Sequence, residues 1–312
     1  MSLINRRGAD SPRALSKEQS QRLARCAVAV GVLALMFAKP LLDLLRFAAQ
    51  SDIYSHVFLV PFMVLYLIWQ KRQGLLSLAW VPSRLAVFPV AMAMGVMAGY
   101  WVMRTSGWAP HHEDYLAVTI LSFAACLVGV GLWFFGEQAC RRAAFPLALL
   151  VFLAPFPTSV LNALEVFFQH ASAEASYAML TLAGVPVFRE GLVMHLPTIV
   201  FQVAQECSGI RSSLVLFITS LLAGHLFLRS PWKKTALALA VVPLAILRNG
   251  FRIFTLGMLC VHVDPAMIKS PIHTRGGPLF FVLSLAPFFL FLWWLRKSES
   301  AGAEPKTVKR GN

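Results

Sequence analysis

Eight apolar runs dominate this sequence of 312 residues. We place them near residues 26–45, 57–69, 85–103, 115–135, 143–163, 212–228, 235–258 and 278–295. A helix that crosses the hydrocarbon core of a bilayer needs about 20 mostly apolar residues, and only the second run is clearly shorter. Hydrophobic residues make up 58% of the chain and charged residues 13%, a composition that excludes a water-soluble domain. The sequence therefore predicts an all-α polytopic integral membrane protein with about eight transmembrane helices.

Basic residues cluster at alternate ends of the apolar runs. The clusters lie at residues 6–25, 71–84, 141–142, 229–234 and 296–310, and they contain most of the 28 Lys and Arg residues. Because Lys and Arg concentrate in cytoplasmic loops, we expect both termini in the cytoplasm and a multi-pass protein of the cytoplasmic (inner) membrane. Contacts with lipid head groups then explain the net charge of +14. Membrane lipid is an expected partner, and nucleic acid is not.

Residues 104–114, 164–206 and 259–277 are expected on the outer, periplasmic side. Many acidic residues also fall there, which indicates that the chemistry takes place outside. In the largest of these segments, apolar residues at helical spacing predict an amphipathic interfacial helix that ends near Gly184, and we expect its Ser172 to be accessible. Extended runs around Gly191 then predict a hairpin before residue 207.

The domain boundaries follow the charged ends of the chain. Residues 1–22 are predicted to be a disordered cytoplasmic basic tail, residues 23–297 a single transmembrane domain, and residues 298–312 a second disordered cytoplasmic basic tail. The five cysteines are scattered and include no Cys-x-x-Cys pair. This spacing indicates neither a disulfide framework nor a zinc site, and we expect no metal and no cofactor.

One cysteine differs in its surroundings from Cys26, Cys126, Cys140 and Cys260. Cys207 lies in the stretch VAQECSGIRSS, after Glu206, with Arg211 four positions on. It precedes a predicted helix, where unpaired N–H groups and the helix dipole favour a thiolate. Most free cysteines are inert small hydrophobic residues, and the other four keep that interpretation. Cys207 is therefore the candidate nucleophile.

Two further polar motifs are expected on the same side of the membrane. The segment RNGFRI contains Arg248, Asn249 and Arg252. Its two arginines share a helical face, and arginines within a membrane commonly have a functional role. The segment HTRGG contains His273, a candidate base. A nucleophile, a base and a cation that face one side of the membrane are the components of a thiol acyl-transfer site.

These motifs resemble those of the exosortase/archaeosortase family of membrane transpeptidase-like proteins. The block around Cys207 is similar to the family's Cys-Ser-Gly block and RNGFRI to its Asn-x-x-Arg block. HTRGG is similar to its third block, which carries His in exosortases and Arg in archaeosortases. Upstream, YSHVFLVPFMVLYLIW resembles the family's Tyr-Ser-His motif, with Val57 where glycine commonly follows the histidine. The resemblance covers roughly residues 50–295.

The resemblance implies a cysteine protease or transpeptidase without a cofactor. Its substrates would be exported proteins that end in a short motif such as Pro-Glu-Pro, a transmembrane helix and a basic tail. By match to the family motifs, Cys207 is the nucleophile, Arg252 stabilises the oxyanion or thiolate, and His273 carries the proton. The supporting residues are His56, Glu206, Arg211, Arg248 and Asn249. The acyl group would pass from a thioester to water, a glycan or a lipid, in a role linked to protein sorting and exopolysaccharide or cell-surface assembly.

Two other classes of protein remain open on the sequence alone. Buried arginine and histidine also suit a transporter or channel with a polar solute path, although their expected place at the outer surface favours the enzyme. A membrane assembly protein or receptor without catalysis is the other alternative. For the single residues, the alternative interpretation is that Arg248 and Arg252 extend only to the lipid head groups and that His273 is a solvated loop residue.

Overall fold

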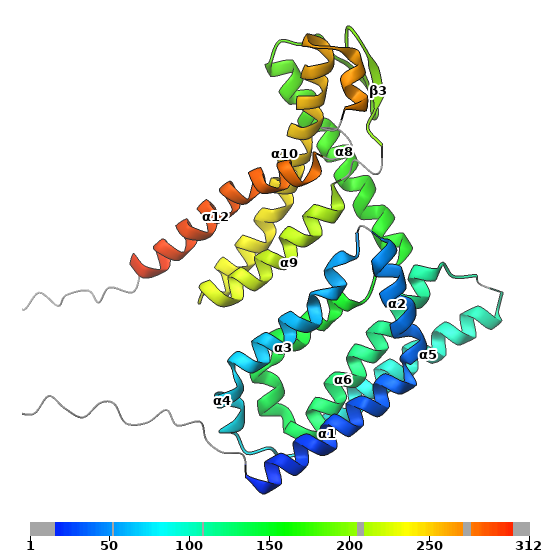
Figure 1. Cartoon of the computed structure of the whole chain (residues 1–312), viewed down its shortest axis with the longest axis vertical. Helices are drawn as coiled ribbons and strands as arrows, with labels where there is room; N and C mark the ends of the chain where they lie inside the picture. Colours follow the sequence, from blue (N-terminus) through cyan, green and yellow to red (C-terminus); the bar gives the residue numbers. More distant parts are fainter. Residues whose placement is uncertain (1–15, 52, 108, 205–208, 271–275, 302–312) are drawn as a thin grey trace, which may run out of the picture. The chain divides into compact units, whose positions relative to one another are not determined.

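The computed structural model describes residues 16–51, 53–107, 109–204, 209–270 and 276–301 (Figure 1). The chain forms two compact units, Met1–Thr158 and Ser159–Asn312. Among the described residues, 5 helices are long and apolar enough to cross a membrane, or up to 7 if each bent pair of helices is one span. The predicted all-α, polytopic membrane fold is confirmed. The predicted number of eight spans is not.

Where it is described, the first unit consists of helices. Ser16 begins the first of them, because its hydroxyl accepts from Gln19 N (3.1 Å) while the Gln19 side chain accepts from Ser16 N (3.2 Å), a capping box. Helices α5 and α6 pack against each other, and α1 packs on α6. The elements are α1 (Lys17–Met36), α2 (Ala38–Gln50), η1 (Ser55–Phe58), α3 (Val60–Gln70), α4 (Arg72–Leu76), η2 (Arg84–Ala86), α5 (Val87–Thr105), α6 (His112–Arg142), α7 (Ala144–Leu149) and η3 (Leu150–Leu153).

The first predicted span is bent. Residues 26–45, expected as one helix, are divided between α1 and α2, whose axes differ by 71°. The break follows from Pro40, which has no N–H to donate and whose ring would collide with the carbonyl of Met36 in a continuous helix. The predicted span at residues 57–69 is also short in the structure, where α3 has 11 residues.

The fifth predicted span is interrupted as well. The helical segment that starts at Ala144 ends at Leu153, and a new helix begins at Thr158. Pro155 and Pro157 lie between them and cannot donate the hydrogen bonds that would continue a helix. The predicted single helix over residues 143–163 is therefore wrong.

A glycine allows a close contact within α6. Gly136 has φ +79° and ψ 177°, so the helical hydrogen bonding is interrupted at this point. A Cβ on this residue would lie 2.1 Å from the carbonyl oxygen of Val81. The segment before η2 can therefore pack against α6 only because residue 136 has no side chain.

The second unit combines helices with a small sheet. The three strands pair antiparallel in the order β1-β2-β3. The hairpin predicted around Gly191 is confirmed, since this residue turns between β1 and β2 with φ +62°. The third strand is not indicated by the sequence. The elements are α8 (Thr158–Leu182), β1 (Phe188–Glu190), β2 (Val193–His195), β3 (Val200–Gln202), α9 (Ile210–Phe227), α10 (Pro231–His262), η5 (Pro265–Lys269) and α12 (Gly277–Ala301).

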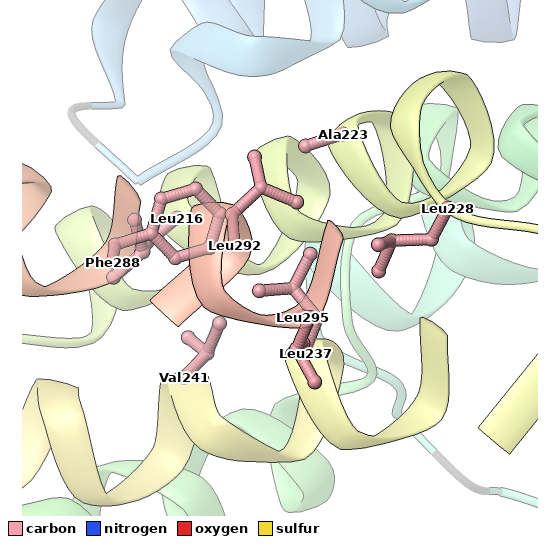
Figure 2. Packing of buried hydrophobic residues seen from close by; sticks show 8 residues of the cluster. All are labelled: Leu216, Ala223, Leu228, Leu237, Val241, Phe288, Leu292 and Leu295. Atoms are coloured by element: carbon pink, nitrogen blue, oxygen red, sulfur yellow. The ribbon is translucent and has the colours of Figure 1, made fainter. Parts of the chain in front are cut away.

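One apolar cluster joins α9, α10 and α12 (Figure 2). Within a bilayer the lipid chains are as apolar as leucine, so such helices associate mainly through van der Waals packing. This cluster provides that packing and fixes α9 beside α10. Its fully or almost fully buried members are Leu216, Ala223, Leu228, Leu237, Val241, Phe288, Leu292 and Leu295.

A second cluster packs the sheet on α8 and α10. It includes Leu180 of α8, Met194 of β2 and Ile253 of α10. Small residues bring α8 and α10 close together, since a Cβ on Gly250 would lie 2.7 Å from Ala175 Cβ. Small residues at such helix contacts allow close backbone approach. The sheet is thereby held beside the part of α10 that carries the predicted arginines.

Two expectations about exposure need correction. Ser172 was expected at an accessible face of the outer helix, but it is fully buried in α8, where its carbonyl oxygen lies beside Gly250. Residues 17–22 and 298–301, which were expected in disordered tails, are helical, because α1 begins at Lys17 and α12 ends at Ala301. Residues 1–15 and 302–312 lie outside the described residues.

Candidate active site

Gly209 forms a tight turn at the start of α9. It adopts the left-handed conformation, with φ +71° and ψ 15°. A Cβ here would lie 3.1 Å from Arg248 Nη2 and 3.2 Å from the side chain of Asn249. The turn therefore needs glycine both for its backbone conformation and for the approach of these two side chains. This residue follows the candidate nucleophile, Cys207, by two positions.

Arg248 connects this turn to α10 through hydrogen bonds. Its Nη2 donates to the Gly209 carbonyl oxygen (3.0 Å) and to Ser213 Oγ (3.2 Å). The same carbonyl accepts from the amide (3.1 Å) and the hydroxyl (2.8 Å) of Ser213. Two motifs separated by 39 residues are thus connected by a direct hydrogen bond. The connection fixes where the chain enters α9.

The charge of Arg248 is buried and not neutralised within the described chain. The residue is only 8% exposed, its Nη1 has no hydrogen-bond partner there, and no described carboxylate forms an ion pair with it. Although Arg248 belongs to α10, its guanidinium lies beside the N-terminal end of α9, where the helix dipole adds positive potential. A buried cation without a counter-ion is costly, so this position favours an anion beside it.

Asn249 and Arg252 line a small cavity next to Arg248. Asn249 is 2% exposed, whereas Arg252 is half-buried. The cavity has a volume of about 120 Å³ and a mostly apolar lining. Arg252 lies four residues after Arg248 and so occupies the same side of α10. The other lining residues are Phe201, Gln202, Val203, Ala204, Ile253, Leu256 and Ile268.

The remaining predicted residues divide into two groups. Arg211 is exposed in the first turn of α9. His56 belongs to the first unit, where it is 6% exposed and its Nδ1 lies 3.2 Å from the Ile53 carbonyl oxygen. Cys207, Glu206 and His273 lie outside the described residues. The structure thus brings together Arg248, Asn249 and Arg252 with the turn after residue 207.

The other cysteines stay with the interpretation of ordinary packing residues. Cys26, Cys126 and Cys140 are partly buried and Cys260 is buried, all of them free. Within the described ranges, no group of three His, Cys, Asp or Glu side chains is placed to hold a metal ion.

Two residues that contribute to this arrangement, Ser213 and Gln169, were not singled out from the sequence, and Gly209 was noted only as part of the Cys-Ser-Gly block. Ser213 accepts from Arg248, and Gly209 supplies the carbonyl that Arg248 binds. Gln169 of α8 is 7% exposed, and its Nε2 donates to the Val203 carbonyl oxygen (2.6 Å) just after β3. The only sequence feature pointing to Gln169 is its spacing with Ser172 and Ser176, which gives the helix a second, small and polar stripe. Ser172 and Ser176 of this stripe lie against Gly250 of α10.

A family model described as transmembrane exosortase matches residues 48–290 of the chain, which is more than three quarters of its length. The chain belongs to the transmembrane exosortase family. The predicted resemblance is therefore confirmed, and its range agrees with the motifs from His56 to His273. No curated protein and no solved structure matches the chain.

Membership of the exosortase family gives the general class of the protein. It is a multi-pass membrane protein, and the family supports a membrane transpeptidase or protease that acts on exported proteins with sorting signals. The part of α10 that contains Arg248, Asn249 and Arg252 lies within the matched range, as does the turn at Gly209.

Proposed function

We propose that this exosortase-family protein is a membrane-embedded cysteine transpeptidase that cleaves the C-terminal sorting signal of exported proteins. The reaction takes place on the periplasmic face of the cytoplasmic membrane, with both termini of the chain in the cytoplasm. The observation that carries the proposal is the hydrogen bond from Arg248 to the Gly209 carbonyl oxygen. It ties the block that contains Cys207 to the block that contains Arg252.

In the proposed reaction, the Cys207 thiolate attacks the carbonyl carbon of the scissile peptide bond. A C–S bond forms, and the carbonyl oxygen becomes an oxyanion that Arg252 stabilises through its N–H donors. The C–N bond then breaks, and His273 gives a proton to the leaving amine. The product is a thioester between the substrate and Cys207.

The second half of the reaction releases the acyl group. An O–H or N–H group of the acceptor gives its proton to His273 and attacks the thioester carbonyl carbon. The C–S bond breaks, and the Cys207 thiolate returns. Water as the acceptor gives hydrolysis, whereas a glycan or lipid acceptor gives transfer to the cell surface and thus links the enzyme to exopolysaccharide or surface assembly.

Arg248 and Asn249 act as positioning residues in this proposal. Arg248 holds the turn that follows the nucleophile through the Gly209 carbonyl and Ser213. Its Nη1 and the positive end of α9 also favour negative charge at this turn, which suits both the thiolate and the oxyanion. Arg211, Glu206 and His56 are proposed to support the site.

The experiment is co-expression with an exported reporter protein that ends in the predicted motif, an apolar helix and a basic tail. Wild-type protein should shorten the reporter, and Cys207→Ala and Cys207→Ser should both accumulate in the membrane but leave it uncleaved. Cys126→Ala is the matched control, because this cysteine is partly buried and lies in none of the family motifs. Normal cleavage by Cys207→Ala would exclude covalent catalysis at this residue.

A further inference from the structure

At the β3 edge of the sheet, the outward main-chain groups have no strand partner among the described residues. Strand β3 is the last in the order β1-β2-β3 and pairs only with β2 among the described strands. The bond from Val203 N to Leu192 O (3.0 Å) shows which residues of this chain segment face β2. In an antiparallel pair these residues alternate, so Phe201 also faces β2. The N–H and C=O groups of Val200 and Gln202 therefore point away from the sheet.

The two residues that carry these outward groups are exposed. Val200 is 58% exposed, and Gln202 is also exposed. No hydrogen bond of either residue is found along this edge in the described chain. Proteins commonly protect such an edge with Lys, Pro, a bulge or a covering element. The sequence of β3, Val-Phe-Gln, contains neither of those residues, so its edge remains a template for a further strand.

The cavity lined by Arg252 lies beside the same strand. Its walls come from Phe201 to Ala204 on one side and from α10 on the other, with Ile268 of η5. The side chains of Phe201 and Val203 pack toward α10 in the second apolar cluster. A peptide paired with β3 would place every second side chain on that face. Since an apolar cavity of about 150 Å³ can take up benzene, this slightly smaller cavity suits one apolar side chain.

We propose that the free edge of β3 binds the substrate segment beside the scissile bond as a fourth, extended strand. Val200 and Gln202 offer alternating N–H donors and C=O acceptors, which complement the main chain of an extended peptide. One apolar substrate side chain enters the cavity, where Arg252 and Asn249 face the substrate carbonyl oxygens with N–H groups. In the sequence, Cys207 follows Gln202 by five residues. The proposal rests on the proposed protease activity.

This mode of binding has a consequence for specificity. Recognition through the main chain tolerates most side chains that point away from the cavity. The enzyme therefore selects strongly at one substrate position, for an apolar side chain of limited size.

The first test blocks the edge with proline. Val200→Pro and Gln202→Pro remove an outward N–H and obstruct strand addition, but they leave the hydrogen bonds to β2 intact because those bonds use other residues. The control is Arg189→Pro compared with Arg189→Ala, since Arg189 is the middle residue of β1 at the opposite edge of the sheet and both changes remove its ion pair with Glu174 and its bond to the Gly191 carbonyl. We expect both β3 variants to raise KM at least tenfold for a peptide that spans the cleavage site, while Arg189→Pro keeps the KM of Arg189→Ala.

The second test uses the wild-type protein and therefore does not depend on variant folding. Single N-methyl groups are placed along the same peptide, each replacing one main-chain N–H. Strand addition predicts that cleavage is lost at alternate positions, because only every second N–H of the peptide faces β3.

The outcomes separate the two proposals. Suppose that wild-type protein cleaves the peptide, the β3 proline variants keep the wild-type KM and the N-methyl scan shows no alternation. Strand addition at β3 is then wrong, while the protease activity stands. If wild-type protein cleaves neither the reporter nor the peptide, the proposed function fails, and this proposal falls with it.

Discussion

Replacing Gly209 by alanine tests the link between the α9 turn and Arg248. A Cβ at this position would lie 3.1 Å from Arg248 Nη2. The left-handed conformation costs a residue with a side chain about 1–2 kcal/mol. Displacing the guanidinium from the Gly209 carbonyl costs roughly another 1.5–3 kcal/mol, the usual contribution of a hydrogen bond to a charged group. We therefore expect Gly209→Ala to lower the free energy of unfolding by about 2.5–5 kcal/mol.

Gly184→Ala is the matched control for backbone strain. Gly184 has a similar φ of +76°, but nothing lies within 4 Å of the position its Cβ would occupy. This variant should lose only about 1–2 kcal/mol of unfolding free energy. Unfolding by denaturant in detergent micelles, followed by tryptophan fluorescence, measures both values.

The same pair of variants separates stability from activity. Because a misplacement of about 1 Å at a catalytic centre can reduce the rate about 100-fold, Gly209→Ala should lower kcat/KM for the reporter by about that factor. Gly184→Ala should retain nearly all activity. Equal losses of stability and of activity in the two variants would refute the coupling between Gly209 and Arg248.

Five other variants test the packing, the chemistry and the orientation. Gly250→Ala should destabilise the protein by about 1–3 kcal/mol in the same unfolding assay, since its Cβ would overlap a side chain of α8. Its control is Gly99→Ala on α5, where the Cβ meets open space, and this variant should be neutral or slightly stabilising. Arg252→Lys should lose about 100-fold in kcat, because lysine cannot reproduce the planar set of donors. His273→Arg should be inactive, because arginine does not release its proton near neutral pH. Substantial activity in either variant would contradict the role assigned to that residue. Ala178→Cys, on the exposed face of α8, should react with an impermeant maleimide from outside intact cells, and labelling only after permeabilisation would reverse the proposed topology.

Hydrophobicity was sufficient to predict the long helices but not their interruptions. A span is recognised from the mean character of about 20 residues, and this average changes little when one proline is included. Pro40 and Pro155 nevertheless end helices, because each lacks an N–H and obstructs the preceding turn. Both residues are visible in the sequence. A proline can be accommodated in some membrane helices, as Pro243 is within α10, so its effect depends on the surrounding packing.

The candidate site was predictable in its motifs and not in its connections. Arg248 and Arg252 were expected on one helical face, and both lie on α10. The acceptors of Arg248 are a main-chain carbonyl at Gly209 and the hydroxyl of Ser213, which only the packing of α9 on α10 brings near. The expected exposure of Ser172 failed for a similar reason. A small polar residue on an amphipathic helix suits both water and a close helix contact, and here Gly250 makes the contact.

The most direct test of the proposed mechanism is the detection of the thioester. Wild-type protein mixed with the cleavage-site peptide and quenched in acid should carry the N-terminal part of the peptide on Cys207, as measured by mass spectrometry of the digested protein. Hydroxylamine should release it, since thioesters react readily with this nucleophile, and Cys207→Ala should form no adduct. An acyl group found on another residue, or cleavage of the peptide by Cys207→Ala, would contradict the assignment of Cys207 as the nucleophile.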